Sequence, residues 1–262
     1  MLGGDADRRL SVFHVFRGTL EPITARKINN LVRFVGAGYR LTKGEVEVEK
    51  KSEMPISFAD AVREFEQAWS NPAFTRIELP QLAVNQVLGN RYITRSPVQM
   101  SRSMVWDMEL KKAWDPLSYI PYVVSEGYSW GRHYLESGVE RFSRSSIQVG
   151  WLNDSTGRVL EDVFIDHIHR RILFLGRSRM DCEGVEQISG SNQPLFHVEH
   201  AAGGTEEDPL NLWRIAVLTE REDDRFKEPF RQMTREGWLP GFLEIYIERD
   251  LGIPLSRRPQ AA

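Results

Sequence analysis

The pattern of strands between residues 146 and 220 is the feature that most constrains how this chain can fold. Segments rich in β-branched and aromatic residues recur there, separated by runs of turn-forming residues. Residues 147–152 and 159–165 flank the loop Asn-Asp-Ser-Thr-Gly, and residues 195–200 and 211–219 flank a longer loop that contains Gly-Gly. These spacings predict two hairpins in an antiparallel meander, with one face of the sheet packed on a core.

The same stretch holds four of the chain's six histidines. Residues 163–175 contain no Gly or Pro, which predicts one long strand. Because side chains alternate along a strand, His167, His169 and Arg171 should share one face. Asp166 should lie on the opposite face, where it cannot orient the ring of His167.

On a second predicted strand, His197 and Glu199 also share a face. If the two strands are adjacent, these side chains and the pair His167 and His169 could converge on a divalent metal such as zinc, because imidazole and carboxylate are common zinc ligands. Arg171 would repel a cation on that face unless it is paired. A solvated or cavity-lining polar face is the other interpretation of the pattern.

Without a metal, the same residues can serve as general acids and bases, since imidazole titrates near neutral pH. Glu199 could orient an imidazole ring across the strands, and Arg171 could hold an enolate or phenolate oxygen. We therefore expect a catalytic set that needs no cofactor, with a divalent metal as the alternative. The set is His167, His169, His197, Glu199 and Arg171, and the first four of these are the alternative metal ligands.

Composition narrows the class of protein. The formal net charge of −3 gives no electrostatic reason to expect a nucleic-acid partner. No apolar run approaches the roughly 18–20 residues that a membrane-spanning helix needs, and the N-terminus lacks the apolar stretch of a secretory signal. The single cysteine, Cys182, excludes an internal disulfide and fits a reducing cytosol. We expect a cytoplasmic protein without a nucleic-acid or membrane partner.

The remaining sequence predicts helices around this sheet. Ser57 should cap one helix, residues 101–114 should form another, and Gly237 should interrupt a terminal helical region. The pair Gly89-Asn90 between apolar residues predicts a tight hairpin. Further N-terminal elements are expected as a strand at 11–17, a helix from Thr24 and a strand at 45–50. The predicted division of the chain is a strand and helix region at 1–78, separate or packed on the main core, an α+β domain at 79–254, and a disordered tail at 255–262.

The order of elements in the second half resembles the helix-grip arrangement of the START and Bet v 1 superfamily. Residues 195–250 also resemble the end of diacetylphloroglucinol and phloretin hydrolases, in which a strand, a Gly-Gly loop (here Gly203-Gly204), a second strand and a terminal helix follow in that order. The resemblance implies an α+β fold in which a curved antiparallel sheet wraps a long C-terminal helix around an apolar cavity. The zinc ligands of those hydrolases are not carried over, because Arg231 and Arg235 stand at the matching positions.

These patterns predict a protein that binds a small aromatic or polyketide-like molecule in an apolar pocket and transforms it without redox chemistry. Cyclisation, dehydration and carbon–carbon bond hydrolysis are the expected reaction types. The aromatic share of 10%, with seven Trp, is compatible with such a pocket. The alternatives are a metal-dependent hydrolase that uses the strand histidines and a non-catalytic ligand carrier or partner-binding domain. A small hydrophobic or aromatic ligand is the expected partner, and a homodimer is left open.

Overall fold

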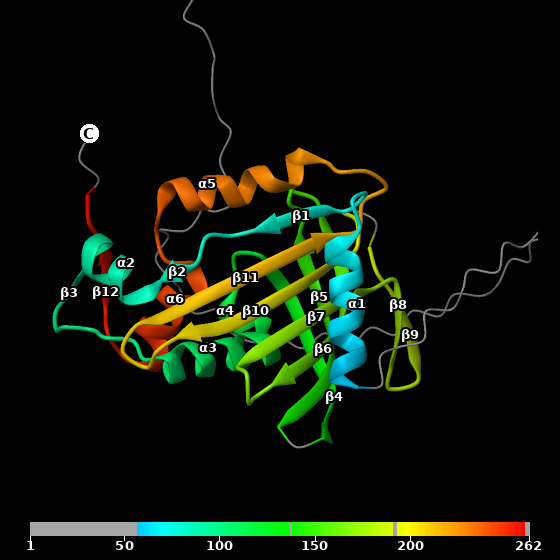
Figure 1. Ribbon diagram of the computed structural model, residues 1–262, viewed down its shortest axis with the longest axis horizontal. Helices are drawn as coiled ribbons and strands as arrows, with labels where there is room; N and C mark the ends of the chain where they lie inside the picture. Colours follow the sequence, from blue (N-terminus) through cyan, green and yellow to red (C-terminus); the bar gives the residue numbers. More distant parts are fainter. Residues whose placement is uncertain (1–56, 137, 191–192, 260–262) are drawn as a thin grey trace, which may run out of the picture. The chain divides into compact units, whose positions relative to one another are not determined.

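The computed structural model describes residues 57–136, 138–190 and 193–259, which belong to one compact unit. This unit is an α+β fold built on a large antiparallel sheet (Figure 1), as expected from the sequence. The elements predicted at 11–17, from Thr24 and at 45–50 lie outside the described residues, and with them most of the predicted region 1–78. No helix in the described part of the chain is long and apolar enough to cross a membrane.

The main sheet has eight strands. Its strands are β1 (Thr75–Glu78), β2 (Leu82–Ala83), β4 (Val124–Glu136), β5 (Val139–Val149), β6 (Thr156–Asp166), β7 (Arg171–Arg177), β10 (Phe196–Gly204) and β11 (Pro209–Val217). Seven follow the order β1-β11-β10-β7-β6-β5-β4, and β2 pairs with β11. Two separate pairs join β3 (Tyr92–Thr94) to β12 (Leu255–Arg257) and β8 (Arg179–Cys182) to β9 (Val185–Ile188). The two predicted hairpins are confirmed as β5–β6 and β10–β11.

Helices cover both faces of the sheet. They are α1 (Phe58–Ser70), α2 (Val84–Arg91), α3 (Arg102–Trp114), α4 (Pro116–Tyr119), α5 (Glu228–Glu236) and α6 (Gly241–Ile245), with a 3-10 turn η1 (Asp224–Lys227) and a π turn η2 (Tyr246–Asp250). α3 contacts β10 and β11 on one side and α6 on the other. Its Ser101 cap accepts a hydrogen bond from the backbone N–H of Met104, which fixes where the helix begins.

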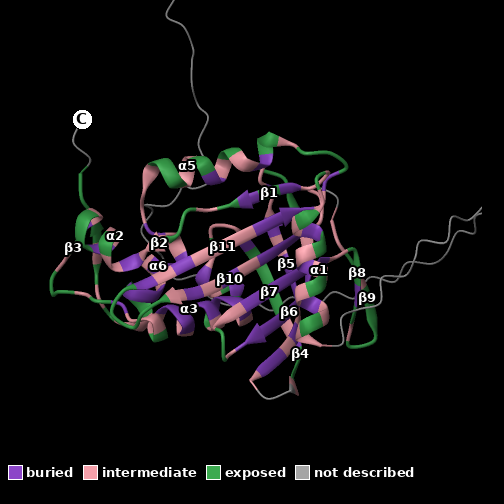
Figure 2. Ribbon diagram, viewed as in Figure 1, coloured by how far each residue is buried: buried purple, intermediate pink, exposed green. Residues whose placement is uncertain are grey.

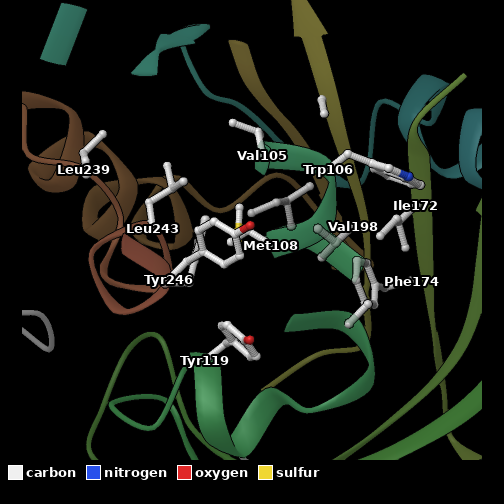
Figure 3. Packing of buried hydrophobic residues seen from close by; sticks show 14 of the residues in the cluster. Val105, Trp106, Met108, Tyr119, Ile172, Phe174, Val198, Leu239, Leu243 and Tyr246 are labelled. Carbon is white, nitrogen blue, oxygen red and sulfur yellow. The ribbon is translucent and has the colours of Figure 1, made fainter. Parts of the chain in front are cut away.

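The main apolar core lies on the face of the sheet that α3 covers, called here the inner face. Figure 3 shows Phe174 and Val198 of the sheet on one side of α3, and Leu243 and Tyr246 of the C-terminal segment on the other. Met108 of α3 is fully buried between these two groups. Burial of this kind contributes roughly 25 cal/mol for each Å² of apolar surface removed from water, so the inner core is the main source of stability.

α1 packs on the opposite, outer face, and its buried side of Ala61 and Phe65 contacts Phe164, Leu173 and Leu175. Ser57 caps it as predicted, because its hydroxyl accepts a hydrogen bond from the backbone N–H of Asp60. The central strands are therefore covered on both sides, and Figure 2 shows β6 and β7 mostly buried. The sequence predicted one covered face, and the structure has two.

The prediction of one long strand over 163–175 is wrong. β6 ends at Asp166, a four-residue turn follows, and the chain returns as β7 from Arg171. The Asp166 carboxylate accepts hydrogen bonds from the backbone N–H groups of Ile168 and His169, and Arg170 adopts a left-handed φ of 55°. An aspartate that bonds to the backbone two and three residues ahead stabilises a turn without Gly or Pro.

Two further local predictions need correction. Gly89-Asn90 lies inside helix α2 and does not form a tight hairpin. Tyr92, which follows that helix, pairs with Arg257 near the C-terminus. The predicted tail at 255–262 begins with that same strand, β12. The predicted interruption at Gly237 is confirmed, because Gly237 ends α5 in a left-handed conformation with φ of 65°, and the chain turns helical again in α6, which continues directly into η2.

Candidate functional site

The five residues proposed from the sequence lie in two different places. His167 is in the β6–β7 turn, half-buried, with Nε2 3.1 Å from a carboxylate oxygen of Glu140. Trp106 packs edge-on against the His167 ring at 5.8 Å between centroids. His169 follows in the same turn with its side chain 75% exposed, and its Nδ1 lies 2.5 Å from Asp166. The prediction that Asp166 faces away from the histidines therefore fails for His169.

His197 does share a face with Glu199, and that face is the outer one, beneath α1. His197 is buried, and its Nε2 lies 3.3 Å from Glu64 of α1. Its Nδ1 accepts a hydrogen bond of 3.1 Å from the backbone N–H of Gly176, so the ring proton belongs on Nε2 and points at Glu64. Burial raises the pKa of the Glu64 carboxyl, but His197 and Arg177 outweigh it and lower that pKa to about 2.

Glu199 is held by two arginines. It forms ion pairs with Arg171 of β7 and Arg214 of β11, and Glu66 of α1 contacts the same two guanidinium groups. The charge of Arg171 is thus matched by carboxylates on the outer face. The sequence had suggested that Glu199 could orient an imidazole ring. In the structure, the Glu199 carboxylate pairs with Arg171 and Arg214 instead.

The structure does not bring His167, His169, His197 and Glu199 together. Two belong to the β6–β7 turn, and two lie under α1 at the middle of β10. Among the residues that the structure describes, no group of three or more His, Cys, Asp or Glu side chains is arranged to hold a metal ion. A chemical role for each of the five residues stays a prediction.

A different polar cluster lies on the inner face, between α3 and β10. Lys112 Nζ lies 2.6 Å from Glu109 Oε2 and 2.8 Å from His200 Nδ1. Glu109 Oε2 is also 3.1 Å from His200 Nδ1. Glu109 is fully buried, Lys112 is 4% exposed and His200 is 9% exposed. Three titratable groups therefore meet in the interior of the fold, and we call them the inner triad.

Local secondary structure explains this meeting. Glu109 and Lys112 are three residues apart on α3, so they project from the same side of the helix. On β10, His200 alternates with the outward-facing Glu199 and so points toward α3, beside Val198 and Ala202 of the inner core.

Neighbouring groups fix the orientation of the triad. The side-chain amide of Asn211 on β11 donates a 2.7 Å hydrogen bond to Glu109 Oε1 and accepts one of 2.6 Å from Trp213 Nε1. The Trp213 ring lies 4.9 Å from the His200 ring between centroids. Lys112 Nζ lies 3.8 Å from the centre of the Phe242 ring, so an aromatic face also contacts the ammonium.

The three groups of the inner triad differ in electrostatic environment. Burial, together with the nearby charge of Arg144, lowers the pKa of Lys112 to about 8, although Glu109 acts in the opposite direction. Burial raises the pKa of Glu109, but Lys112 and His200 outweigh it and hold that pKa well below its ordinary value. Burial and the Lys112 charge lower the pKa of His200. The Glu109 carboxylate accepts from several donors, whereas the Lys112 ammonium has one counter-charge, Glu109, and the positive charge of Arg144 nearby.

Arg144 of β5 completes the inner polar layer. It pairs with Glu161 of β6 at 2.5 Å, and both side chains are buried. Its second amino group donates a 3.0 Å hydrogen bond to the carbonyl of Ala113, at the C-terminal end of α3. A cation there satisfies a helix-end carbonyl and interacts favourably with the helix dipole. The position of Lys112 relative to the sheet is therefore fixed from both α3 and β5.

Sequence reasoning missed the inner triad. His200 had been counted among the strand histidines but not assigned a role, and Glu109 and Lys112 lie about ninety residues away from it along the chain. A usable signal existed in the predicted helix at 101–114, where Glu109 and Lys112 fall among residues that the structure buries, such as Val105 and Met108. Charged residues on the apolar side of a helix are rarely buried unless they are paired.

The structure also contains an open groove of about 490 Å³ between β1 and α5. Its lining combines basic Arg76, Lys227, Arg231 and Arg235 with acidic Glu78 and with apolar Ile77, Leu79, Pro80 and Phe230. None of the inner triad lines it. The apolar ligand pocket expected from the sequence stays a prediction.

Comparisons with known proteins do not assign a family. No family model matches the chain, and no curated protein matches its sequence. Among solved structures, the chain is similar to the crystal structure of the ZhuI aromatase/cyclase from Streptomyces sp. R1128, with a TM-score of 0.39 and 12% identity. The match covers 67% of this chain and 95% of that one. A similarity of this size assigns neither a substrate nor a reaction to this chain.

Proposed function

We propose that this protein is a non-redox enzyme that acts on a small aromatic or polyketide-like carbonyl compound by acid–base chemistry at the inner triad. The observation that carries the proposal is the burial of Glu109, Lys112 and His200 in mutual contact on the inner face. Perturbed titratable groups that meet in an interior are characteristic of catalytic sites, although structural ion pairs also perturb pKa values.

Each member of the triad has a role that follows from its protonation state. The Lys112 ammonium can donate only, so His200 Nδ1 accepts from it and the His200 ring carries its proton on Nε2. Near neutral pH, Lys112 has a pKa close enough to the medium to exchange a proton in either direction. Glu109 stays ionised and supports the positive charge of Lys112. Proton removal next to a carbonyl, followed by cyclisation, dehydration or carbon–carbon cleavage, can use such a positioned acid–base group.

Aromatic neighbours define the class of compound proposed. Trp213 and Phe242 pack 5.2 Å apart between ring centroids, and both rings flank the triad. His200 and Trp213 keep part of their surface exposed, whereas Glu109 keeps none. A flat aromatic ligand stacked beside Trp213 would reach His200 and Lys112 before it reached Glu109.

A binding and turnover experiment tests the proposal. Tryptophan fluorescence is measured while a panel of aromatic polyketides and aryl ketones is added, and any compound that binds is followed for conversion. We expect quenching that disappears in Trp213→Phe, and conversion that falls at least a hundredfold in Lys112→Met, in line with the loss of one positioned acid–base group. Lys111→Met is the matched control, since its side chain is exposed on the same helix.

The outcomes separate the function classes. Binding with no conversion of any member would favour a ligand carrier over an enzyme. Conversion that survives in Lys112→Met would remove the inner triad from the mechanism. The roles predicted for His167, His169, His197, Glu199 and Arg171 are tested in the same assay by single alanine variants. Conversion that fell in those variants and persisted in the triad variants would return the site to the residues predicted from the sequence.

A further inference from the structure

Two adjacent lysines of α3 have opposite surroundings. Lys111 has a side chain that is 43% exposed and forms ion pairs with Asp107 at 2.7 Å and Asp250 at 3.1 Å. These carboxylates raise its pKa. Lys112 is 4% exposed and has one carboxylate partner, Glu109. Consecutive helical residues point about 100° apart, so one amine faces solvent and the other faces the sheet.

The groups that face Lys112 come from every element packed against it. Glu109 on α3 supplies the negative charge, His200 on β10 a ring nitrogen, and Arg144 on β5 a neighbouring positive charge. Trp213 and Phe242 present their rings to the same amine. A buried amine beside a second cation and apolar walls is readily deprotonated, and a neutral amine is a nucleophile.

We propose that Lys112 forms a Schiff base with a carbonyl group of the ligand. This inference deepens the proposed function, since it uses the same site and names the carbonyl carbon as the atom that reacts. It also gives a role to a feature that acid–base chemistry alone does not require, which is the contact of the buried lysine amine with the rings of Trp213 and Phe242.

The steps balance with the groups present. The neutral Lys112 amine attacks the carbonyl carbon, a nitrogen–carbon bond forms as the carbon–oxygen π bond breaks, and one proton of the attacking nitrogen moves to the carbonyl oxygen to give a neutral carbinolamine. The carbon–oxygen bond then breaks and water leaves, with its second proton supplied through His200, to give a protonated imine. Glu109, 2.6 Å from the lysine nitrogen, remains the counter-ion of that positive charge. The imine withdraws electrons from the adjacent carbon, which assists the carbon–carbon bond chemistry proposed above.

Reductive trapping tests the inference on the intact wild-type protein. The chain is incubated with benzaldehyde and sodium cyanoborohydride at a series of pH values, and the extent of benzylation at each lysine is measured by peptide mass spectrometry. Lys111 is an internal control one residue away. At pH 8 about half of Lys112 is neutral, whereas an ordinary lysine is neutral to less than about 1%. We expect at least tenfold more label on Lys112 than on Lys111.

The pH dependence of labelling identifies the reactive amine by its pKa, whatever the accessibility of each lysine to benzaldehyde. Labelling of Lys112 should rise up to about pH 8 and then level, whereas labelling of Lys111 should still be rising above that pH. Lys112→Arg should lose the selective label while keeping the positive charge at that position, and its circular dichroism spectrum shows whether it folds. Label on Lys112 equal to or below that on Lys111 at every pH would overturn the inference.

Failure of this inference is distinguishable from failure of the proposed function. If aryl ketones quench Trp213 and are converted while Lys112 takes no label, the Schiff base is excluded and the acid–base role stands. If Lys112 is labelled selectively but Lys112→Met and wild-type protein convert every bound compound equally, the nucleophilic amine is supported and the proposed reaction is not.

Discussion

Breaking the buried ion pair between Glu109 and Lys112 by substituting one partner should lower the free energy of unfolding more than any substitution on the surface of this protein. Lys112→Met leaves a carboxylate that is fully buried with only Asn211 and His200 beside it, and breaking a buried pair in this way typically costs about 3–5 kcal/mol. Glu109→Gln removes the carboxylate that raises the pKa of Lys112, so in this variant that pKa falls below about 8 and releasing the proton at pH 7 costs less than about 1.4 kcal/mol. The lysine variant should therefore be the less stable of the two.

The double variant gives the decisive number. The double variant removes both charges, so no unpaired charge is left buried. Replacing a buried ion pair by neutral groups often leaves the unfolding free energy nearly unchanged. We expect the loss of unfolding free energy in the double variant to be at least about 2 kcal/mol smaller than the sum of the two single losses. Urea unfolding at pH 7, followed by tryptophan fluorescence and far-UV circular dichroism, measures all four proteins.

Lys111→Met controls for loss of a lysine from α3. Its exposed pairs with Asp107 and Asp250 should contribute less than about 1 kcal/mol. If the single losses of Lys112→Met and Glu109→Gln add to within about 0.5 kcal/mol in the double variant, the two charges do not depend on each other, and the inner triad is not a coupled unit.

Three other predictions concern the frame of the site. Gly176→Ala should destabilise strongly, because a Cβ there would lie 2.4 Å from a backbone oxygen of the next strand, whereas Gly89→Ala in open space on α2 should stabilise by up to about 1 kcal/mol; thermal unfolding compares them. Glu64 has a folded pKa of about 2, below its ordinary 4.5, so its stabilising effect is complete above pH 4.5 and is lost as the pH falls toward 2. Glu64→Gln should therefore lower the unfolding free energy at pH 7 and flatten its dependence on acid pH, as measured by urea titrations. Tyr92→Phe removes the hydroxyl that bonds Glu244 and accepts from a backbone N–H, and should cost about 1–3 kcal/mol in the same assay; an unchanged midpoint would contradict that role.

Much of the sheet could be predicted because its signals are local. The hairpins β5–β6 and β10–β11 follow from alternating segments around turn-forming loops, and the start of α1 follows from Ser57. The break after Asp166 could not be found from Gly or Pro, because a side chain makes that turn. The face assignments of His167 and His169 failed with it.

The inner triad could not be assembled from the sequence for a different reason. Its members lie on a helix and a strand about ninety residues apart, and only the packing of α3 across β10 brings them together. The sequence reasoning also covered only one face of the sheet, so His197 and Glu199 were taken as pocket residues. The structure places them in an ion network under α1.

The two ends of the main sheet have a consequence for self-association. An edge strand offers unpaired backbone groups to any other strand, which is how many proteins polymerise. Here one edge, β4, is interrupted by three shifts in its register with β5, and the other, β1, has four residues with exposed Arg76 and Glu78. Bulges and charges at an edge disfavour the pairing of one sheet with another. In the described part of the chain, both edges of the eight-stranded sheet thus carry features that disfavour its growth into a fibril.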